Sequence, residues 1–313
     1  MRCAELSWYD CQHAEKAEAV TVLKALLAGV VDYAGLFPPA GVDMPVAVQN
    51  YAAYRARDDS WMLGRFVVPA GRLDDFAKQL RALGDQAGSE WRLSALLGAD
   101  IDGDIERVRA FDREHRGRAR VDSLEGKLVT IDAMQRAADA AGSAFAVFAE
   151  IPSHGDVESL IAAAERLGIN AKIRTGGVTA DVFPPPDAVV RFIRCCVEAG
   201  VAVKATAGLH HAVRGEYRLT YDAAAPTGTM FGFLNVMLAA AAIADGRSDA
   251  DALALLEEHD PAAFTATETT IRCRDVTLDE EHARTLRDRV LVSFGSCSFT
   301  EPVEELRALV LLP

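Results

Sequence analysis

The sequence predicts an α/β protein that folds as a single (β/α)₈ barrel, the TIM-barrel architecture. Short apolar strands alternate with amphipathic helices along the chain, eight such units can be counted, and the loops between most of them are short. Alternation of this kind gives a parallel sheet, and eight units are the number that closes a barrel. An open doubly wound sheet is the main alternative. However, no strand is followed by G-x-G-x-x-G or a Walker-type glycine loop.

The first half of the chain supplies four of these units. After a helical segment at about 14–28, the first strand begins at Val30 and ends in the proline-stiffened loop Phe37–Pro39. The next three strands are expected at Leu63–Pro69, Trp91–Leu97 and about Ala119–Leu124. Apolar residues at helical intervals predict the helices that follow these four strands, at Pro45–Arg57, Leu73–Leu83, Ile105–Glu114 and Ile131–Ala141.

The second half completes the barrel after an irregular stretch. Strands are expected at Ala144–Ile151, from Asn170, from Val201 and at Val290–Cys297, with helices Val157–Leu167, Pro186–Gly200 and Val303–Leu309. Between strands seven and eight, about 212–289, we expect a loop, helices Met230–Ala244 and Ala250–Glu258, and an insertion at Thr265–Val276. Ser298 and Glu301 have capping-box spacing before the last helix. We therefore expect one domain over 1–313, with an N-terminal helical extension at about 1–28.

Composition narrows the class of partner. The formal net charge of −13 argues against nucleic acid as a partner, because phosphate binding needs basic surface, but a local basic pocket could still hold a small anion.

The six cysteines form no C-x-x-C pair, which favours reduced thiols; they are Cys3, Cys11, Cys195, Cys196, Cys273 and Cys297. The N-terminus lacks the apolar core of a signal peptide, and no stretch predicts a membrane span. We expect a soluble, cytoplasmic protein; whether it forms a homo-oligomer is open.

Residues at the carboxyl ends of barrel strands line the active site. This rule selects Asp32, Asp100, Glu125, Lys127, Glu150, Lys172, Arg174, Lys204, His210, His211 and Cys297. Strand side chains alternate between faces, so Lys172 and Lys204 project away from the apolar faces of two parallel neighbouring strands. Nearby cations and an apolar wall would favour the neutral amine, which is a nucleophile. In the alternative interpretation, one or both lysines are structural and pair with Glu125 or Glu150 inside the barrel.

The two lysine-bearing segments have a family resemblance. K-I-R-T-G-G at 172–177 and V-K-A-T-A-G-L at 203–209 resemble the K-T-S-T-G and V-K-A-S-G-G motifs of class I aldolase barrels of the deoxyribose-phosphate aldolase type. The resemblance is confined to about residues 170–211 and implies that Lys172 forms a Schiff base with Lys204 assisting. It also implies that Gly176, Gly177 and Gly208 let backbone amides approach a substrate anion.

The resemblance is incomplete. Arg174 replaces a small residue, Ala207 replaces a glycine, and two histidines follow where the family has none. Asp100 is the nearest candidate for the strand-three aspartate of that family.

Other residues extend the candidate site. His210 could move protons near neutral pH, and His210 or His211 could join Glu150 and Asp32 in a divalent-metal site. Cys297 could act as a nucleophile whose thiolate is favoured by the start of the following helix, or it could be a small buried side chain.

The glycine turns also suit an anion. Gly295 and Ser296 precede a helix N-terminus, a position where barrels often hold phosphate. The turn at Gly176 and Gly177 forms a second candidate cradle, next to Arg174.

Three hypotheses follow. In the first, an aldolase-like lyase or isomerase acts next to a carbonyl on a small carboxylated or phosphorylated substrate. Lys172 is the Schiff-base lysine, and Lys204 lowers the pKa of Lys172. Arg174 holds the anion, and Glu150 or His210 moves protons. It requires no cofactor. In the second, a divalent-metal lyase, isomerase or hydrolase uses Glu150 with His210 or His211. In the third, a non-catalytic barrel binds a small anion.

Overall fold

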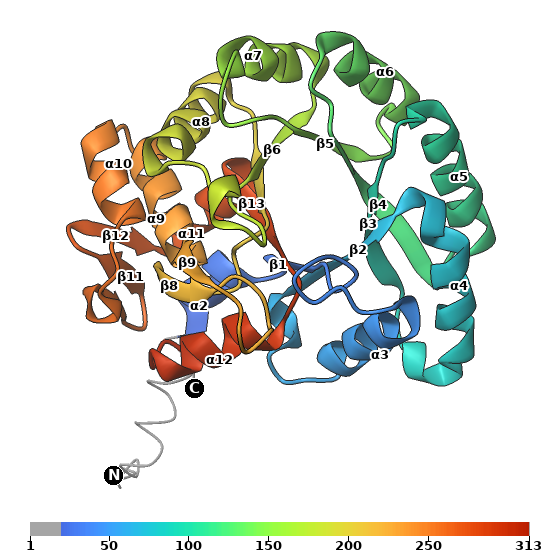
Figure 1. The fold of residues 1–313 in the computed structure, drawn as a ribbon, viewed down its shortest axis with the longest axis horizontal. Helices are drawn as coiled ribbons and strands as arrows, with labels where there is room; N and C mark the ends of the chain where they lie inside the picture. The colour runs from blue at the N-terminus through green and yellow to red at the C-terminus, as the bar shows by residue number, and fades with distance from the viewer. Residues whose placement is uncertain (1–19, 313) are drawn as a thin grey trace, which may run out of the picture.

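The protein is a closed barrel of eight parallel strands surrounded by helices (Figure 1), as the computed structural model of residues 20–312 shows. The strand order around the barrel is β1-β13-β7-β6-β5-β4-β3-β2, and every pair of neighbours is parallel. The predicted (β/α)₈ barrel with an insertion between its seventh and eighth strands is therefore confirmed. Cys3, Cys11 and residues 14–19 of the predicted first helix lie outside the described residues.

The strands of the barrel agree closely with the predicted segments. They are β1 (Val31–Tyr33), β2 (Leu63–Pro69), β3 (Trp91–Leu96), β4 (Ala119–Gly126), β5 (Ala146–Glu150), β6 (Asn170–Arg174), β7 (Val203–Thr206) and β13 (Leu291–Ser296). The fourth strand runs two residues further than predicted, so that Glu125 lies within the barrel wall.

Helices surround the barrel (Figure 1). They are α2 (Val20–Leu27), α3 (Met44–Arg55), α4 (Leu73–Ala82), α5 (Ile101–Glu114), α6 (Ile131–Ala141), α7 (Val157–Leu167), α8 (Pro186–Ala199), α9 (Phe233–Ala244), α10 (Asp249–Leu256), α11 (Glu280–Arg289) and α12 (Thr300–Ala308). Asp100 accepts a hydrogen bond from the amide of Gly103 and caps α5, which starts four residues earlier than predicted. None of the described helices is long and apolar enough to cross a membrane.

The region between β7 and β13 contains more structure than the sequence predicts. The expected loop holds the antiparallel hairpin β8 (Gly215–Arg218) and β9 (Thr227–Met230). The expected insertion is a three-stranded antiparallel sheet, β10 (Phe264–Ala266), β11 (Thr270–Cys273) and β12 (Val276–Asp279). In this sheet buried Ile271 and Cys273 alternate with exposed Arg272, because successive strand residues face opposite sides.

The two faces of the barrel wall differ in chemistry. On β2 and β3, Phe66, Val68 and Leu93 face the helices and are fully buried. The inward face instead carries polar side chains at buried positions, among them Asp32, Ser94, Glu125, Lys204 and Ser293. Barrel interiors are usually filled by branched aliphatic residues. A buried polar interior needs a complete set of partners, and those partners form the candidate site.

Candidate active site

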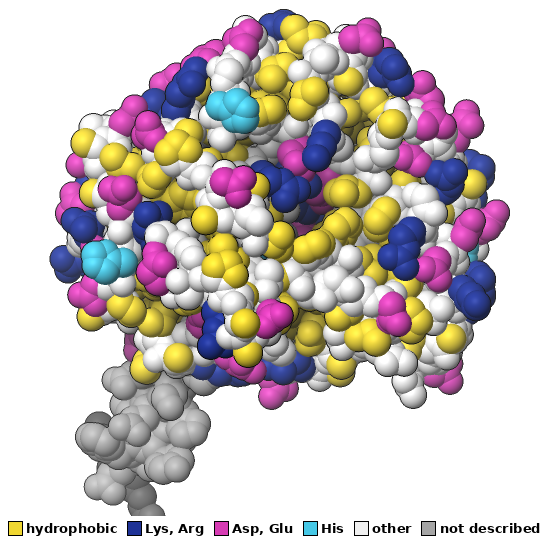
Figure 2. All heavy atoms as spheres, in the orientation of Figure 1, with side chains coloured by type: hydrophobic (Ala, Val, Ile, Leu, Met, Phe, Trp, Pro, Cys, Tyr) yellow, Lys and Arg dark blue, Asp and Glu magenta, His cyan; other side chains and the backbone are white. Residues whose placement is uncertain are grey.

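A cavity of about 780 Å³ opens at the carboxyl ends of the barrel strands. Its lining includes twelve of the residues selected from the sequence: Glu125, Lys127, Glu150, Lys172, Arg174, Gly176, Gly177, Lys204, Gly208, His210, Gly295 and Cys297. Figure 2 shows this hollow near the centre of the molecule, with basic and acidic side chains inside it and hydrophobic side chains around it.

Lys172 and Lys204 lie side by side on neighbouring strands. They are direct partners in the parallel register of β6 and β7, so alternation turns both side chains to the same, inner side of the wall. Lys172 is 3% exposed and Lys204 1% exposed, yet both line the cavity. An ammonium group at this depth requires carboxylate partners, because its desolvation is costly.

Glu125 lies between the two lysines and pairs with both. Its Oε2 is 2.7 Å from Lys172 Nζ, and its Oε1 is 2.5 Å from Lys204 Nζ. Lys204 Nζ also contacts Asp32 Oδ2 at 2.6 Å, and Lys172 Nζ contacts Glu150 Oε2 at 3.0 Å. The pairing with Glu125 and Glu150 that the structural interpretation of the lysines predicted is therefore present, together with their exposure to the cavity.

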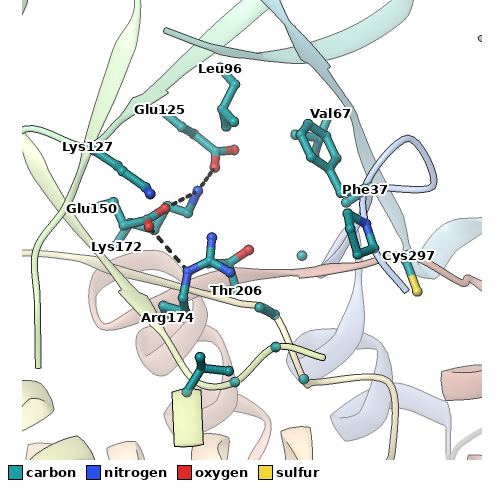
Figure 3. A pocket seen from close by; sticks show the side chains of 18 of the residues that line it. Phe37, Val67, Leu96, Glu125, Lys127, Glu150, Lys172, Arg174, Thr206 and Cys297 are labelled. Carbon is teal, nitrogen blue, oxygen red and sulfur yellow. Dashed lines mark hydrogen bonds and ion pairs between the residues drawn. The ribbon is translucent and has the colours of Figure 1, made fainter. Parts of the chain in front are cut away.

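Arg174 ends this ionic chain at the mouth of the cavity. Its Nε is 3.4 Å from Glu150 Oε1, so one carboxylate bridges Arg174 and Lys172 (Figure 3). The chain thus alternates in charge from Asp32 through Lys204, Glu125, Lys172 and Glu150 to Arg174. With every member ionised, three negative and three positive charges balance.

Three polar groups that the sequence did not single out hold the inner end of the chain. Ser94 Oγ donates to Glu125 Oε1 at 2.5 Å, and Ser293 Oγ donates to Asp32 Oδ2 at 2.9 Å. The amide of Arg65 donates to Asp32 Oδ1 at 2.6 Å. Strand alternation could have identified the serines, since each is a small polar residue between outward apolar neighbours on a predicted strand.

The electrostatics of the inner end differ from the prediction. Burial alone would raise the pKa of Glu125, but the attraction of Lys172 and Lys204 outweighs burial and holds that pKa well below its usual range. Burial alone would lower the pKa of Lys204, but Asp32 and Glu125 outweigh burial and raise it. We expected nearby cations to favour a neutral amine. At Lys204 that expectation is wrong, because carboxylates are its nearest neighbours.

Glu150 is more accessible than Glu125, with 12% of its side chain exposed. Burial would raise its pKa, but Lys172 and Arg174 lower it overall. Glu150 is therefore a carboxylate at neutral pH, in contact with a cavity amine. It can accept a proton.

His210 and Cys297 lie together on the cavity wall. His210 Nδ1 is 3.5 Å from Cys297 Sγ and 3.4 Å from Ser296 Oγ. Burial, with a smaller effect of His211, lowers the pKa of His210 to about 4, and burial raises the pKa of Cys297 to about 11. Both groups are thus neutral near pH 7. Of the two interpretations of Cys297, the surroundings favour the small buried side chain over the thiolate, because burial disfavours the charge and α12 begins only at Thr300.

The glycine turns after β6 and β7 pack tightly against each other. A Cβ added to Gly176 would lie 2.4 Å from Phe183 Cε1, and one added to Gly208 would lie 3.2 Å from Gly176 Cα. Ala207 and Gly208 both have positive φ, 63° and 72°. No hydrogen bond joins the amide of Gly176, Gly177 or Gly208 to another described residue. These amides are therefore free to bind an anion in the cavity.

Four predicted residues do not line the cavity. Asp100 is exposed and caps α5, while Asp32 is completely buried beneath Lys204. Ser296 is buried behind His210. His211 Nδ1 contacts Glu305 Oε1 at 2.5 Å, and its ring stacks on Tyr217.

Over residues 20–312, no group of three His, Cys, Asp or Glu side chains is arranged to hold a metal ion. The side chains named for the metal alternative are therefore not gathered into one ligand set there. The four cysteines in that range, Cys195, Cys196, Cys273 and Cys297, are free thiols.

Comparison with known proteins gives no indication of the function. No protein-family model matches the chain, and no curated protein matches it either. Function must therefore be argued from the cavity and its ionic chain.

Proposed function

We propose that the protein is an enzyme that forms a Schiff base between Lys172 and the carbonyl group of a small anionic substrate, and then breaks, makes or rearranges a bond next to that carbonyl. One observation carries the proposal: the amine of Lys172 reaches a cavity while it contacts two carboxylates, Glu125 and Glu150. A nucleophilic lysine needs access to substrate and a base to receive its proton.

Glu150 receives the proton that Lys172 must lose. Its Oε2 is 3.0 Å from Lys172 Nζ, within hydrogen-bond reach, and it is ionised at neutral pH. Transfer of the proton leaves a neutral amine and a neutral carboxylic acid, so the total charge of the ionic chain is unchanged. That balance makes the transfer less costly than release of a proton to bulk water.

The neutral amine then attacks the carbonyl carbon. One proton of the amine and the proton held by Glu150 pass to the departing oxygen, which leaves as water, and an iminium ion remains on Lys172. The iminium accepts the electron pair of an adjacent carbon–carbon or carbon–hydrogen bond as that bond breaks. Glu150, again a carboxylate, or His210, neutral at pH 7, accepts the proton released from the substrate.

Lys204 assists Lys172 as a charged group in the proposed mechanism. Because Asp32 and Glu125 raise its pKa, Lys204 remains an ammonium ion and does not serve as a second neutral amine. Its charge keeps Glu125 ionised and fixes that carboxylate against Lys172. Lys204 is therefore a positioning residue in the proposed mechanism.

The anion of the substrate is held at the mouth. Arg174 is about half exposed there and pairs with Glu150 through Nε, at 3.4 Å. Gly176, Gly177 and Gly208, whose amides form no hydrogen bond with another described residue, line the same side of the cavity. A carboxylate or phosphate bound to these groups would lie next to the reacting carbonyl.

Borohydride trapping tests the Schiff base. The protein is incubated with candidate oxo compounds and sodium borohydride, and mass spectrometry locates any stable secondary amine. We expect the adduct on Lys172 and a loss of at least about 10³-fold in turnover in Lys172→Ala. Lys78→Ala is the matched control, because Lys78 is an exposed lysine on α4 and is not among the residues that line the cavity. Retained turnover in Lys172→Ala would reject the proposal.

A non-catalytic anion-binding barrel is the second candidate, and the ion pairs of both lysines favour it. In that case the lysines only supply charge. A ligand would then raise the melting temperature without being consumed. Loss of the ligand from solution over time, followed by NMR, distinguishes the two candidates.

A further inference from the structure

The cavity wall opposite the ionic chain is apolar. The strand order places β2 opposite β6 and β1 opposite β5 across the closed barrel. Val67 on β2 therefore faces Arg174 on β6, and Phe37, in the loop after β1, lies across from Glu150. Figure 3 shows Phe37 and Val67 on one side of the cavity, with the charged residues on the other.

This apolar surface continues along the neighbouring segments. Pro38 and Pro39 follow Phe37, while Leu96 and Leu97 come from the end of β3. Among the described residues from β1 to β3, no charged side chain lines the cavity. Apolar groups gain free energy on leaving water for such a surface, whereas hydroxyl groups placed there would lose hydrogen bonds. A polyhydroxylated substrate is therefore a poor fit for this half of the cavity.

The charged wall limits the distance between the reacting carbonyl and the acid group. Lys172 and Arg174 contact the two oxygens of one carboxylate, Glu150, at 3.0 and 3.4 Å. Because both cationic groups contact the same carboxylate, they lie close to each other. A carbonyl at Lys172 and an acid group at Arg174 would be separated by few bonds, as they are in 2-oxo and 3-oxo acids. A phosphate at the far end of a sugar chain would extend past Arg174.

We propose that the substrate is a small oxo acid with an apolar substituent. Arg174 binds its carboxylate, the carbonyl faces Lys172, and the substituent packs against Phe37, Val67 and Leu96. Lys127 lines the charged side without an ion pair to any described residue and supplies a second cation for the carboxylate. This assignment rests on the proposed Schiff-base function for the reaction, but the binding that it predicts does not.

Calorimetry tests the binding with ligands that cannot react. We expect 4-methylpentanoate, which is an apolar acid without an oxo group, to bind, and glycerol 3-phosphate not to bind. Val67→Thr keeps the shape of the side chain and should weaken binding of 4-methylpentanoate about 5- to 20-fold. Arg174→Gln should weaken it at least about 10-fold. Val178→Thr, a change on the charged side of the same cavity, should leave the affinity unchanged and is the matched control.

Trapping with borohydride tests the reaction separately. We expect 4-methyl-2-oxopentanoate to form a reduced secondary amine on Lys172: the amine attacks the oxo carbon, the oxygen leaves as water, and hydride reduces the iminium. Glyceraldehyde 3-phosphate is the comparison and should give no specific adduct.

The outcomes separate the two claims. An adduct with glyceraldehyde 3-phosphate alone, without binding of 4-methylpentanoate, would overturn the oxo-acid assignment and keep the Schiff-base function. Binding of 4-methylpentanoate that depends on Val67 and Arg174, with no adduct from any oxo compound, would overturn the Schiff-base function and keep the apolar acid site. Equal affinity in wild type and Val67→Thr would reject the role of the apolar wall.

Discussion

The inner and outer ends of the ionic chain contain the same kinds of residue but differ in their surroundings. At the inner end, Asp32 is completely buried, and Lys204, Ser293 and the Arg65 amide occupy its oxygens. At the outer end, Glu150 is partly exposed and Arg174 is about half exposed at the cavity mouth. Two lysines in direct register can therefore have two different tasks. The inner one holds charge in place, and the outer one is available for chemistry.

Removal of the inner lysine should cause the largest change in stability. Lys204→Met leaves Asp32 and Glu125 buried without their shared cation. Breaking a buried pair in this way costs about 3–5 kcal/mol. Urea unfolding measures the loss, and Lys127→Met at the exposed rim should change stability by less than about 0.5 kcal/mol. If Lys204→Met were as stable as the rim variant, the inner end would not be the structural end.

Neutralising the outer carboxylate should affect turnover more than stability. Glu150→Gln removes the proton acceptor of Lys172 but keeps the shape of the side chain, so we expect turnover to fall about 10²- to 10³-fold. Lys172 keeps its ion pair with Glu125, and Arg174 is about half exposed. The free energy of unfolding should therefore change by less than about 1 kcal/mol. Steady-state kinetics and urea unfolding on one preparation check both expectations. A large stability loss with normal turnover would reverse the comparison.

Acid should destabilise the cavity wall through His210. Its pKa falls from 6.5 to about 4 on folding, so between these values the unfolded chain binds the proton and the folded chain does not. Stability is then fully present above pH 6.5 and declines as the pH falls towards 4, by about 1–3 kcal/mol for this group. His210→Asn should lose that part of the slope, which unfolding at several pH values measures. An unchanged slope would place His210 in solvent.

A substitution in the turn after β7 should have the smallest effect on stability. Ala207 has a φ of 63°, a conformation that costs a residue with a Cβ about 1–2 kcal/mol and that glycine adopts freely. Because glycine also loses more chain entropy on folding, Ala207→Gly should stabilise the protein by no more than about 1 kcal/mol. Thermal unfolding checks this. Destabilisation would mean that the methyl group of Ala207 contributes more through packing than its backbone strain costs.

Much of the fold could be predicted because its signals are local. The second strand, Leu63–Pro69, and the helices Ile131–Ala141 and Val157–Leu167 have the predicted bounds. Apolar periodicity defines each of them, and Gly142 and Gly168, both with positive φ, end the two helices. The hairpin at 215–230 was missed because its strands are polar and largely exposed, so they lack an apolar alternation.

The partners within the site could be predicted only in part. Alternation along β6 and β7 is sufficient to turn Lys172 and Lys204 to one side. The pairing of Lys204 with Asp32 joins residues 172 positions apart and depends on the closure of the barrel through β13. No local pattern reports such a contact. The sequence therefore predicts which side chains converge, but not that Glu125 lies between the lysines and keeps Lys204 charged.

The most direct measurement is a crystal structure of the protein after borohydride trapping with an oxo acid. We expect continuous electron density from Lys172 Nζ to a substrate carbon, with Lys204 Nζ still bound to Asp32 and Glu125. Density that joins the substrate to Lys204 would contradict this expectation. So would a substrate bound in the cavity without a covalent link to either amine.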